Sequence, residues 1–251
     1  MKSSDYFNRA NAKLRRKDYK GAIIDYDIAI EMTPNQYDYY DNRGNVKDLI
    51  KDHKGAIDDF TYAIKINHEN PNAYYNRGIA KSNLKDFTGA IVDFNSAIKL
   101  NPRHALAYAN MGDAKSDLDD FNGAIDAFTE AIMIKPDYAG AYLNRGTAKK
   151  KLKDYDSAIN DYNYAIELNS SFACLAYALI GDIKNELSNC SEAIAYYTLA
   201  LKIHSNVNWI YYKRGIAKIE FELIDEGCMD LKIAAKLGYS KASEALKKYC
   251  P

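Results

Sequence analysis

A short phrase containing Asn-Arg-Gly returns along this chain at a spacing of 34 residues. Its glycines are Gly44, Gly78, Gly112, Gly146, Gly181 and Gly215, with Ala10 at the corresponding place of the first copy. Self-similarity at a fixed period of this length is typical of a solenoid, in which each unit packs against its neighbours and all units share one core. The chain is therefore expected to be a stacked array and not a globular enzyme.

Each unit is predicted to contain two amphipathic helices. Apolar residues recur three and four positions apart on both sides of a short break, such as residues 84–87. Counted from the glycine, an aromatic lies four positions before it, a small residue twelve after it and an alanine nineteen after it. The small residues allow two helices to approach closely, and an aspartate in the break can cap the second helix.

This pattern resembles the tetratricopeptide repeat, in an Asn-Arg-Gly variety, over nearly the whole chain. The resemblance implies an all-α fold, a right-handed α-α superhelix of seven helix-turn-helix repeats followed by a capping helix at 240–250. The predicted repeats are 3–36, 37–70, 71–104, 105–138, 139–172, 174–207 and 208–239, within a single domain of residues 1–251. One extra residue, near Ala173, separates the fifth repeat from the sixth.

An arginine and an aspartate are lost together in two of the seven repeats. Arginine directly precedes the glycine, or Ala10, in five repeats, and aspartate lies fifteen positions after it in the same five. The fourth repeat has Met111 and Ala127 instead, and the sixth has Ile180 and Tyr196. Pairing between adjacent repeats would not give this match. We therefore predict an ion pair between the two helices of one repeat, held by the planar guanidinium.

A lysine lies three positions after the glycine in every repeat, where the family usually has an aromatic. These are Lys13, Lys47, Lys81, Lys115, Lys149, Lys184 and Lys218. We expect their stems to cover apolar surface while the ammonium groups remain in water. The alternative is a cationic binding stripe.

The resemblance implies that the first helix of each repeat lines a concave groove. Asparagine stands two positions before the glycine, or Ala10, in five successive repeats, and these residues are called the asparagine ladder: Asn8, Asn42, Asn76, Asn110 and Asn144. An amide side chain both donates and accepts hydrogen bonds. In families with such a ladder it holds the backbone of an extended peptide, so the ladder is a candidate peptide-binding site. The alternative is that these asparagines brace neighbouring helices.

Neighbouring groove positions are expected to select the ligand. The candidates are Asp41, Asn45, Tyr75 and Asp113. Groove carboxylates gather in the second, fourth and sixth repeats and are interrupted by a few lysines, so a neutral or basic segment is favoured. The carboxylates are Asp38, Asp41, Asp48, Asp113, Asp117, Asp182 and Glu186, and the lysines are Lys150, Lys151 and Lys213.

The last two repeats carry apolar residues at groove positions. Leu179, Trp209 and Tyr212 are candidate contact residues there, because an exposed aromatic patch often marks an interface. The alternative is that the capping helix covers this patch.

Composition excludes several other functions. Lys+Arg and Asp+Glu both total 34, so no net basic charge supports nucleic-acid binding. No stretch approaches the roughly 20 apolar residues that a membrane span needs, and the N-terminus lacks a signal-like apolar run. The four cysteines have no metal-ligand spacing. Because no export signal is seen, a cytoplasmic location with reduced thiols is expected.

The sequence indicates a binding protein without catalysis, cofactor or metal. It contains neither a Gly-rich phosphate loop nor a plausible nucleophile–base constellation. The leading hypothesis is a protein–protein interaction scaffold that binds an extended peptide or a partner helix in its groove. The alternative is self-assembly into a homo-oligomer, through the groove or the apolar C-terminal patch.

Overall fold

A computed structural model describes residues 1–250, which form fifteen α-helices, one short 3-10 helix and no strand. The chain divides into two compact units, Met1–Lys135 (unit 1) and the part from Pro136 onward (unit 2). The predicted all-α repeat fold is confirmed. A single continuous solenoid over residues 1–251 stays a prediction.

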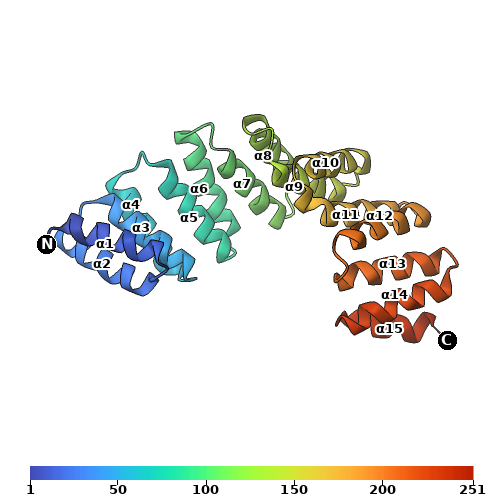
Figure 1. Cartoon of the computed structure of the whole chain (residues 1–251). Coiled ribbons are helices and arrows are strands. Elements are labelled where there is room, and N and C mark those ends of the chain that lie inside the picture. Colours follow the sequence, from blue (N-terminus) through green and yellow to red (C-terminus); the bar gives the residue numbers. More distant parts are fainter. Residues whose placement is uncertain (251) are drawn as a thin grey trace. The chain divides into compact units, whose positions relative to one another are not determined.

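Unit 1 contains four antiparallel helix pairs (Figure 1). They are α1 (Ser3–Arg15) with α2 (Tyr19–Met32), α3 (Tyr37–Leu49) with α4 (His53–Ile66), α5 (Pro71–Asn83) with α6 (Phe87–Leu100), and α7 (Ala105–Asp117) with α8 (Phe121–Ile134). Each second helix also packs against the first helix of the next pair, and α5 contacts both α3 and α7. The outward residues of α3, α5 and α7 therefore form a shared surface, called the first-helix face.

Unit 2 contains three further pairs and a final helix. They are α9 (Ala139–Lys151) with α10 (Tyr155–Leu168), α11 (Ala173–Glu186) with α12 (Cys190–Ile203), and α13 (Asn208–Glu220) with α14 (Ile224–Lys236), and α15 (Ser240–Tyr249) packs on α14. The extra residue that the sequence shows near Ala173 lies where the 3-10 helix η1 (Ser170–Phe172) leads into α11. Helix α11 has 14 residues, one more than α9 or α13.

The turn inside each helix pair follows one local rule. A residue in the left-handed conformation, such as Lys85 with φ 64°, is followed by the N-cap of the second helix. In five pairs the cap is an aspartate whose carboxylate accepts a hydrogen bond from the backbone N–H three residues on, so the predicted cap is confirmed. The capping aspartates are Asp18, Asp52, Asp86, Asp120 and Asp154.

The recurring glycine marks the closest approach of the two helices. A Cβ atom placed on Gly78 would lie 2.6 Å from the ring of Phe94, and one on Gly44 would lie 2.8 Å from the ring of Phe60. Both rings are fully buried. Because a packed core tolerates little added volume, these positions hold the small residue that the spacing of the helices requires.

The predicted ion pairs between the two helices of one repeat are confirmed. In the third repeat Arg77 donates from Nε to Asp93 Oδ2 at 2.9 Å and from its terminal nitrogen to Oδ1 at 2.6 Å. The aspartates are 1–3% exposed. The hydrogen bond from Arg9 lowers the pKa of Asp25 to about 2. The five pairs are Arg9–Asp25, Arg43–Asp59, Arg77–Asp93, Arg145–Asp161 and Arg214–Asp230.

The expectation that the repeated lysines keep their ammonium groups in water is wrong. In the same five repeats the lysine is a second cation on the buried aspartate, at 2.6–3.1 Å: Lys13, Lys47, Lys81, Lys149 and Lys218. Arginine and lysine lie four residues apart on the first helix and thus share one side of it. In repeats without the aspartate, Lys115 lies 3.9 Å from Asp120 and Lys184 lies 2.7 Å from Glu192.

The arginine also links one repeat to the preceding one. Arg43 donates to Asp27 of α2 at 2.6 Å, and Arg77 donates to the hydroxyl of Thr61 in α4 at 3.1 Å. The aromatic residue three positions before the arginine lies against its guanidinium, as Tyr74 does beside Arg77 at 5.7 Å. One side chain therefore joins three helices.

The expectation of reduced thiols is wrong for two of the four cysteines. Cys228 of α14 and Cys250 form a disulfide, with their Cα atoms 5.8 Å apart. Helix α15 folds back on α14 and brings these residues together, although they are 22 positions apart and no metal-ligand spacing marks them. The thiols of Cys174 and Cys190 remain free.

Replacing one member of a buried ion pair should cost more stability than replacing both. We expect Asp93→Ala to lower the free energy of unfolding by about 3–5 kcal/mol, because it leaves two cations without their carboxylate. The double change Arg77→Met with Asp93→Ala reproduces the pair of the fourth repeat and should cost less. In the double variant Lys81 can turn to the capping Asp86, as Lys115 does to Asp120 in the fourth repeat.

Urea unfolding followed by far-UV circular dichroism measures the difference. Equal loss of stability in the single and the double variant would show that the unpaired charge is not the source of the cost.

Candidate functional site

The asparagine ladder lies on the first helices, and its members differ in surroundings. In unit 1, Asn8 is exposed, whereas Asn42, Asn76 and Asn110 are half-buried on α3, α5 and α7. The amide of Asn42 donates to the backbone carbonyl of Asp38 at 2.8 Å. Asn110 donates to the hydroxyl of Tyr75 at 2.9 Å, which ties α7 to α5. The alternative role of these asparagines, bracing of neighbouring helices, therefore applies to Asn110.

The fifth member of the ladder belongs to unit 2. Asn144 is half-buried on α9, two residues before Gly146. Unit 1 therefore contains four of the five predicted asparagines.

A hollow between α3 and α5, called the α3–α5 hollow, contains two of the predicted residues. Its volume is about 260 Å³, and it is lined by Asn45, Asp48, Leu49, Phe60, Asn76 and Ile79. Asp48 accepts hydrogen bonds from His53 at 2.6 Å and from the amide of Asn83 at 3.5 Å. The hollow thus combines an apolar floor with amide and carboxylate oxygens.

A second hollow, called the α5–α7 hollow, lies one repeat further along the same face. Its volume is about 350 Å³, and it is lined by Ile79, Ser82, Asn83, Phe94, Asn110, Asp113, Ala114 and Asp117. It contains the predicted residues Asn110 and Asp113 and shares Ile79 with the first hollow. Two adjacent hollows therefore follow the first-helix face of unit 1.

Asp41, another predicted residue, lies on α3 one turn before Asn45. Its Oδ2 accepts a hydrogen bond from the amide of Asn45 at 3.3 Å, while Oδ1 is buried and has no hydrogen-bond partner within residues 1–250. Burial raises the pKa of Asp41, and the charge of Asp38 adds to this. The nearby amides of Asn76 and Asn45 act in the opposite direction. A donor from a ligand would satisfy this oxygen.

Tyr75, also predicted, connects the ladder to the start of α7. Its hydroxyl accepts the hydrogen bond from Asn110, and its ring lies 4.6 Å from the imidazole of His104. His104 is the N-cap of α7, and its Nδ1 accepts the backbone N–H of Ala107 at 3.2 Å. Burial lowers the pKa of His104. The repeat pattern does not reveal this role, because a histidine stands eight positions before the glycine in the fourth repeat only.

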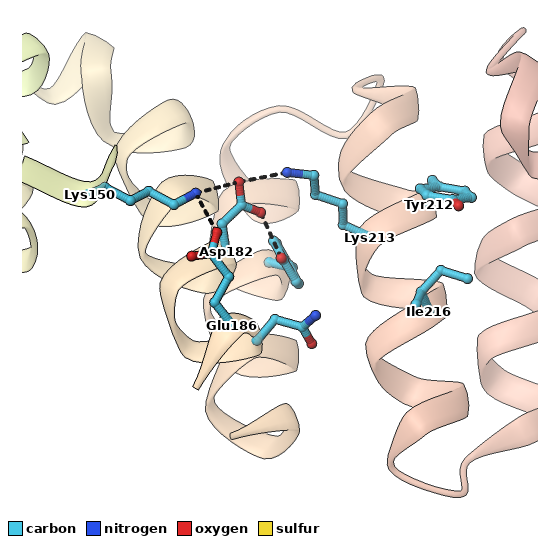
Figure 2. Close-up of a pocket in the computed structure, with 8 residues that line it drawn as sticks. Lys150, Asp182, Glu186, Tyr212, Lys213 and Ile216 are labelled. Atoms are coloured by element: carbon cyan, nitrogen blue, oxygen red, sulfur yellow. Dashed lines mark hydrogen bonds and ion pairs between the residues drawn. The ribbon is translucent and has the colours of Figure 1, made fainter. Parts of the chain in front are cut away.

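In unit 2 the groove carboxylates and lysines neutralise one another (Figure 2). The buried carboxylate of Asp182 accepts hydrogen bonds from Lys213 at 2.6 Å, from Lys150 at 3.4 Å and from the hydroxyl of Tyr197 at 2.8 Å. Lys150 also lies 3.3 Å from Glu186. These side chains line a hollow of about 300 Å³. The acidic character expected for the sixth repeat is therefore cancelled inside the protein.

The apolar candidates in unit 2 mostly pack against their own unit. Leu179 and Trp209 pack against buried core residues, and the ring of Tyr212 lies 4.9 Å from that of Tyr239, which precedes α15. The ammonium of Lys213 lies 5.2 Å from the centre of the Trp209 ring. Leu175 is 42% exposed. The patch is thus smaller than the sequence suggested.

Within residues 1–250, no group of three or more His, Cys, Asp or Glu side chains is arranged to hold a metal ion. Every helix in this part of the chain is too short or too polar to cross a membrane.

Models of the tetratricopeptide repeat match residues 71–104, 105–138 and 139–172. Residues 71–172 are therefore similar to tetratricopeptide repeats. No curated protein matches the sequence.

Three solved structures show similar folds. MamA is 26% identical to this chain, and the TM-score is 0.63. The matched region includes 65% of this chain and 96% of the MamA chain. A tetratricopeptide repeat protein from Parabacteroides merdae ATCC 43184 is 20% identical, covers 98% of this chain and 97% of its own, and has a TM-score of 0.73. YrrB, described as a protein with an unusual peptide-binding site, is 24% identical, covers 66% and 85%, and has a TM-score of 0.58.

The cap at His104 should make the stability of unit 1 depend on pH. The neutral imidazole accepts the Ala107 N–H, so the folded state binds fewer protons than the unfolded state. The stabilisation that this cap gives is complete above the pKa of histidine in the unfolded chain, about 6.5, and is lost as the pH falls below that value. We expect a loss of about 1 kcal/mol, the usual worth of a cap.

His104→Asn should keep the cap, because asparagine is a good N-cap, and remove this pH dependence. Thermal unfolding between about pH 7.5 and 5.5 measures both. The control is His68→Asn, at an exposed histidine of the same unit. An unchanged pH profile in His104→Asn would contradict the assignment.

Proposed function

We propose that this chain is a non-catalytic protein-interaction scaffold whose first helices bind an extended peptide or a partner helix. The observation that carries the proposal is the pair of adjacent hollows along the first-helix face of unit 1, which together contain Asn45, Asn76, Asn110 and Asp113. These residues were selected by their place in the repeat alone, and they meet at concave sites. Ligand sites are typically concave, with a few polar groups among apolar side chains.

The ladder supplies chemistry suited to a peptide backbone. The amides of Asn76 and Asn110 line successive hollows, so they repeat along the face as backbone groups repeat along a peptide. Each amide offers a donor and an acceptor. Contacts of this kind hold the main chain without reading side chains, and neighbouring residues then select the sequence.

The scaffold is rigid before a ligand arrives. In the second, third and seventh repeats the arginine of the ion pair joins three helices, as in Arg77 with Asp93 and Thr61. A surface that is already ordered loses little conformational entropy on binding, and modest contacts can then add up to useful affinity. The description of YrrB as a peptide-binding protein of similar fold agrees with this proposal.

The favoured partner is neutral or basic. In unit 1 the carboxylates of Asp38, Asp41, Asp48, Asp113 and Asp117 lie on the first helices. An acidic segment would meet repulsion there, and rejection of wrong partners is a common use of interface charge.

Self-assembly is the weaker alternative. It depended partly on the apolar patch of the last two repeats, and Leu179, Trp209 and Tyr212 largely pack within unit 2. Light scattering at several concentrations tests it, since a strict monomer would exclude it.

The cytoplasmic location inferred from the sequence stays a prediction. The Cys228–Cys250 disulfide weighs against it, because cytosolic thiols are kept reduced.

Removal of three ladder asparagines should weaken peptide binding. Peptides selected from a random display library on the intact chain should bind the triple variant Asn42→Ala, Asn76→Ala, Asn110→Ala at least about tenfold more weakly, since several hydrogen bonds are lost. Fluorescence anisotropy measures the affinities. The matched control is Asn95→Ala, at an exposed asparagine on the second helix α6.

Because Asn110 also bonds Tyr75, the unfolding midpoint of each variant is measured beside its affinity. Selected peptides that bind the folded triple variant as well as they bind the intact chain would place the binding site elsewhere.

A further inference from the structure

The two hollows of unit 1 combine the same kinds of side chain, although their carboxylates come from different helices, Asp48 from α3 and Asp117 from α7. In the α3–α5 hollow the apolar floor is Phe60 with Ile79, and the polar wall includes Asp48. In the α5–α7 hollow the floor is Phe94 with Ile79, and the polar wall includes Asp117. Among the residues that the structure describes, no arginine or lysine lines either hollow. Each hollow therefore pairs an apolar surface with carboxylate and amide oxygens and has no arginine or lysine in its lining, although Asp48 also contacts the imidazole of His53.

The cations of the same helices are held on the opposite side. On α3, Arg43 and Lys47 both bind the buried carboxylate of Asp59, at 2.6 and 2.8 Å. On α5, Arg77 and Lys81 are bound to Asp93 in the same way. These side chains cannot neutralise the hollows without leaving a buried carboxylate unpaired, which is costly. The negative charge of the first-helix face is thus fixed by the fold.

A carboxylate beside the α3–α5 hollow, bonded to the lining residue Asn45, is incompletely used. Oδ1 of Asp41, beside Asn45, is buried and has no hydrogen-bond partner within residues 1–250. Asp48 uses its Oδ1 for His53 and Asn83. A buried acceptor without a donor is destabilising, so a ligand that brings donors gains free energy here.

We propose that each hollow receives one positively charged side chain, arginine or lysine, from the segment that the scaffold binds. This inference rests on the proposed peptide-binding function and names the chemistry that it selects. The aliphatic stem would lie on the partly exposed Ile79, above the buried ring of Phe60 or Phe94, and the charged end would reach Asp48 or Asp117. Long basic side chains commonly bury their stems while their charged ends make polar contacts.

The arrangement of the two hollows limits the spacing of the two basic residues. The hollows are adjacent because they share Ile79 of α5, whereas Asp48 on α3 and Asp117 on α7 lie on either side of that helix. In a polyproline II segment residues three apart face the same side and are separated by about 9.3 Å. The best-fitting ligand therefore carries basic residues three positions apart, in the order basic-x-x-basic.

Synthetic peptides test this directly. The probe is a fluorescein-labelled, proline-rich dodecapeptide with two arginines three positions apart. Its companions carry two lysines, two citrullines or two glutamates at those positions, or the arginines two positions apart. Citrulline keeps the shape and most donors of arginine but has no charge. We expect the arginine or the lysine peptide to bind at least about tenfold more tightly than the citrulline peptide at low salt, and the advantage to shrink at high salt.

Variants of the protein locate the effect. Asp117→Asn, at an exposed position that leaves the core intact, and Asp48→Asn should each reduce the charge-dependent part of the affinity several-fold. Asp58→Asn makes the same change of charge at an exposed position on the second helix α4 and should have no effect. Unfolding midpoints measured in parallel show whether Asp48→Asn still folds.

The outcomes separate this inference from the proposed function. If arginine, citrulline and glutamate peptides bind equally and only the triple asparagine variant weakens them, the scaffold binds peptides but the hollows do not select charge. If Asp58→Asn weakens the arginine peptide as much as Asp117→Asn does, the attraction is general and the inference is wrong. If no peptide binds, the inference is overturned together with the peptide proposal.

Discussion

The buried aspartate between the two helices of a repeat is the interaction on which the rest of this structure depends. Removing a carboxylate from water is costly unless strong donors surround it. Here an arginine gives two hydrogen bonds and a lysine contributes a second positive charge, as Arg77 and Lys81 do for Asp93. The same guanidinium continues to the preceding repeat at Thr61. Orientation within a repeat and stacking between repeats are therefore set by one polar cluster.

This cluster also determines where a ligand can bind. Residues that lie one before and three after the glycine face the second helix. The helical period then turns the residues two before, one after and five after it toward the other side. In the second repeat these are Asn42, Asn45 and Leu49, and in the third they are Asn76, Ile79 and Asn83. The hollows of unit 1 are thus a geometric consequence of the ion pairs behind them.

The sequence predicted the positions that recur in every repeat and the pairs of residues that are replaced together. The pairing of Arg77 with Asp93 could be found because Met111 and Ala127 replace both partners at once in another repeat. The role of Lys81 could not be found in this way, because lysine persists in every repeat whether or not the aspartate is present. A residue that never changes carries no information about its partner.

Other features depended on contacts that no spacing reveals. The hollows form between side chains of different repeats, and the balance of Asp182 by Lys150 and Lys213 joins three helices of unit 2. The ladder was predicted from its register, but the bond from Asn110 to Tyr75 depends on how α5 and α7 pack. Features that depend on one repeat alone were therefore predictable from the sequence. Contacts between different repeats were not.

The two ends of the chain differ in how they can come apart. Repeat arrays are stabilised by nearest-neighbour interfaces, so their terminal helices, with one neighbour missing, are the first to detach. At one end α15 is joined covalently to α14 through Cys228 and Cys250, and closing a loop of this size is worth about 3 kcal/mol. At the other end α1 is held by noncovalent contacts, which include packing, the ion pairs around Asp25 and the hydrogen bond from Tyr26 to Asn11. Under oxidising conditions the disulfide therefore keeps α15 attached to α14, and a reductant would leave α15 held by noncovalent contacts only.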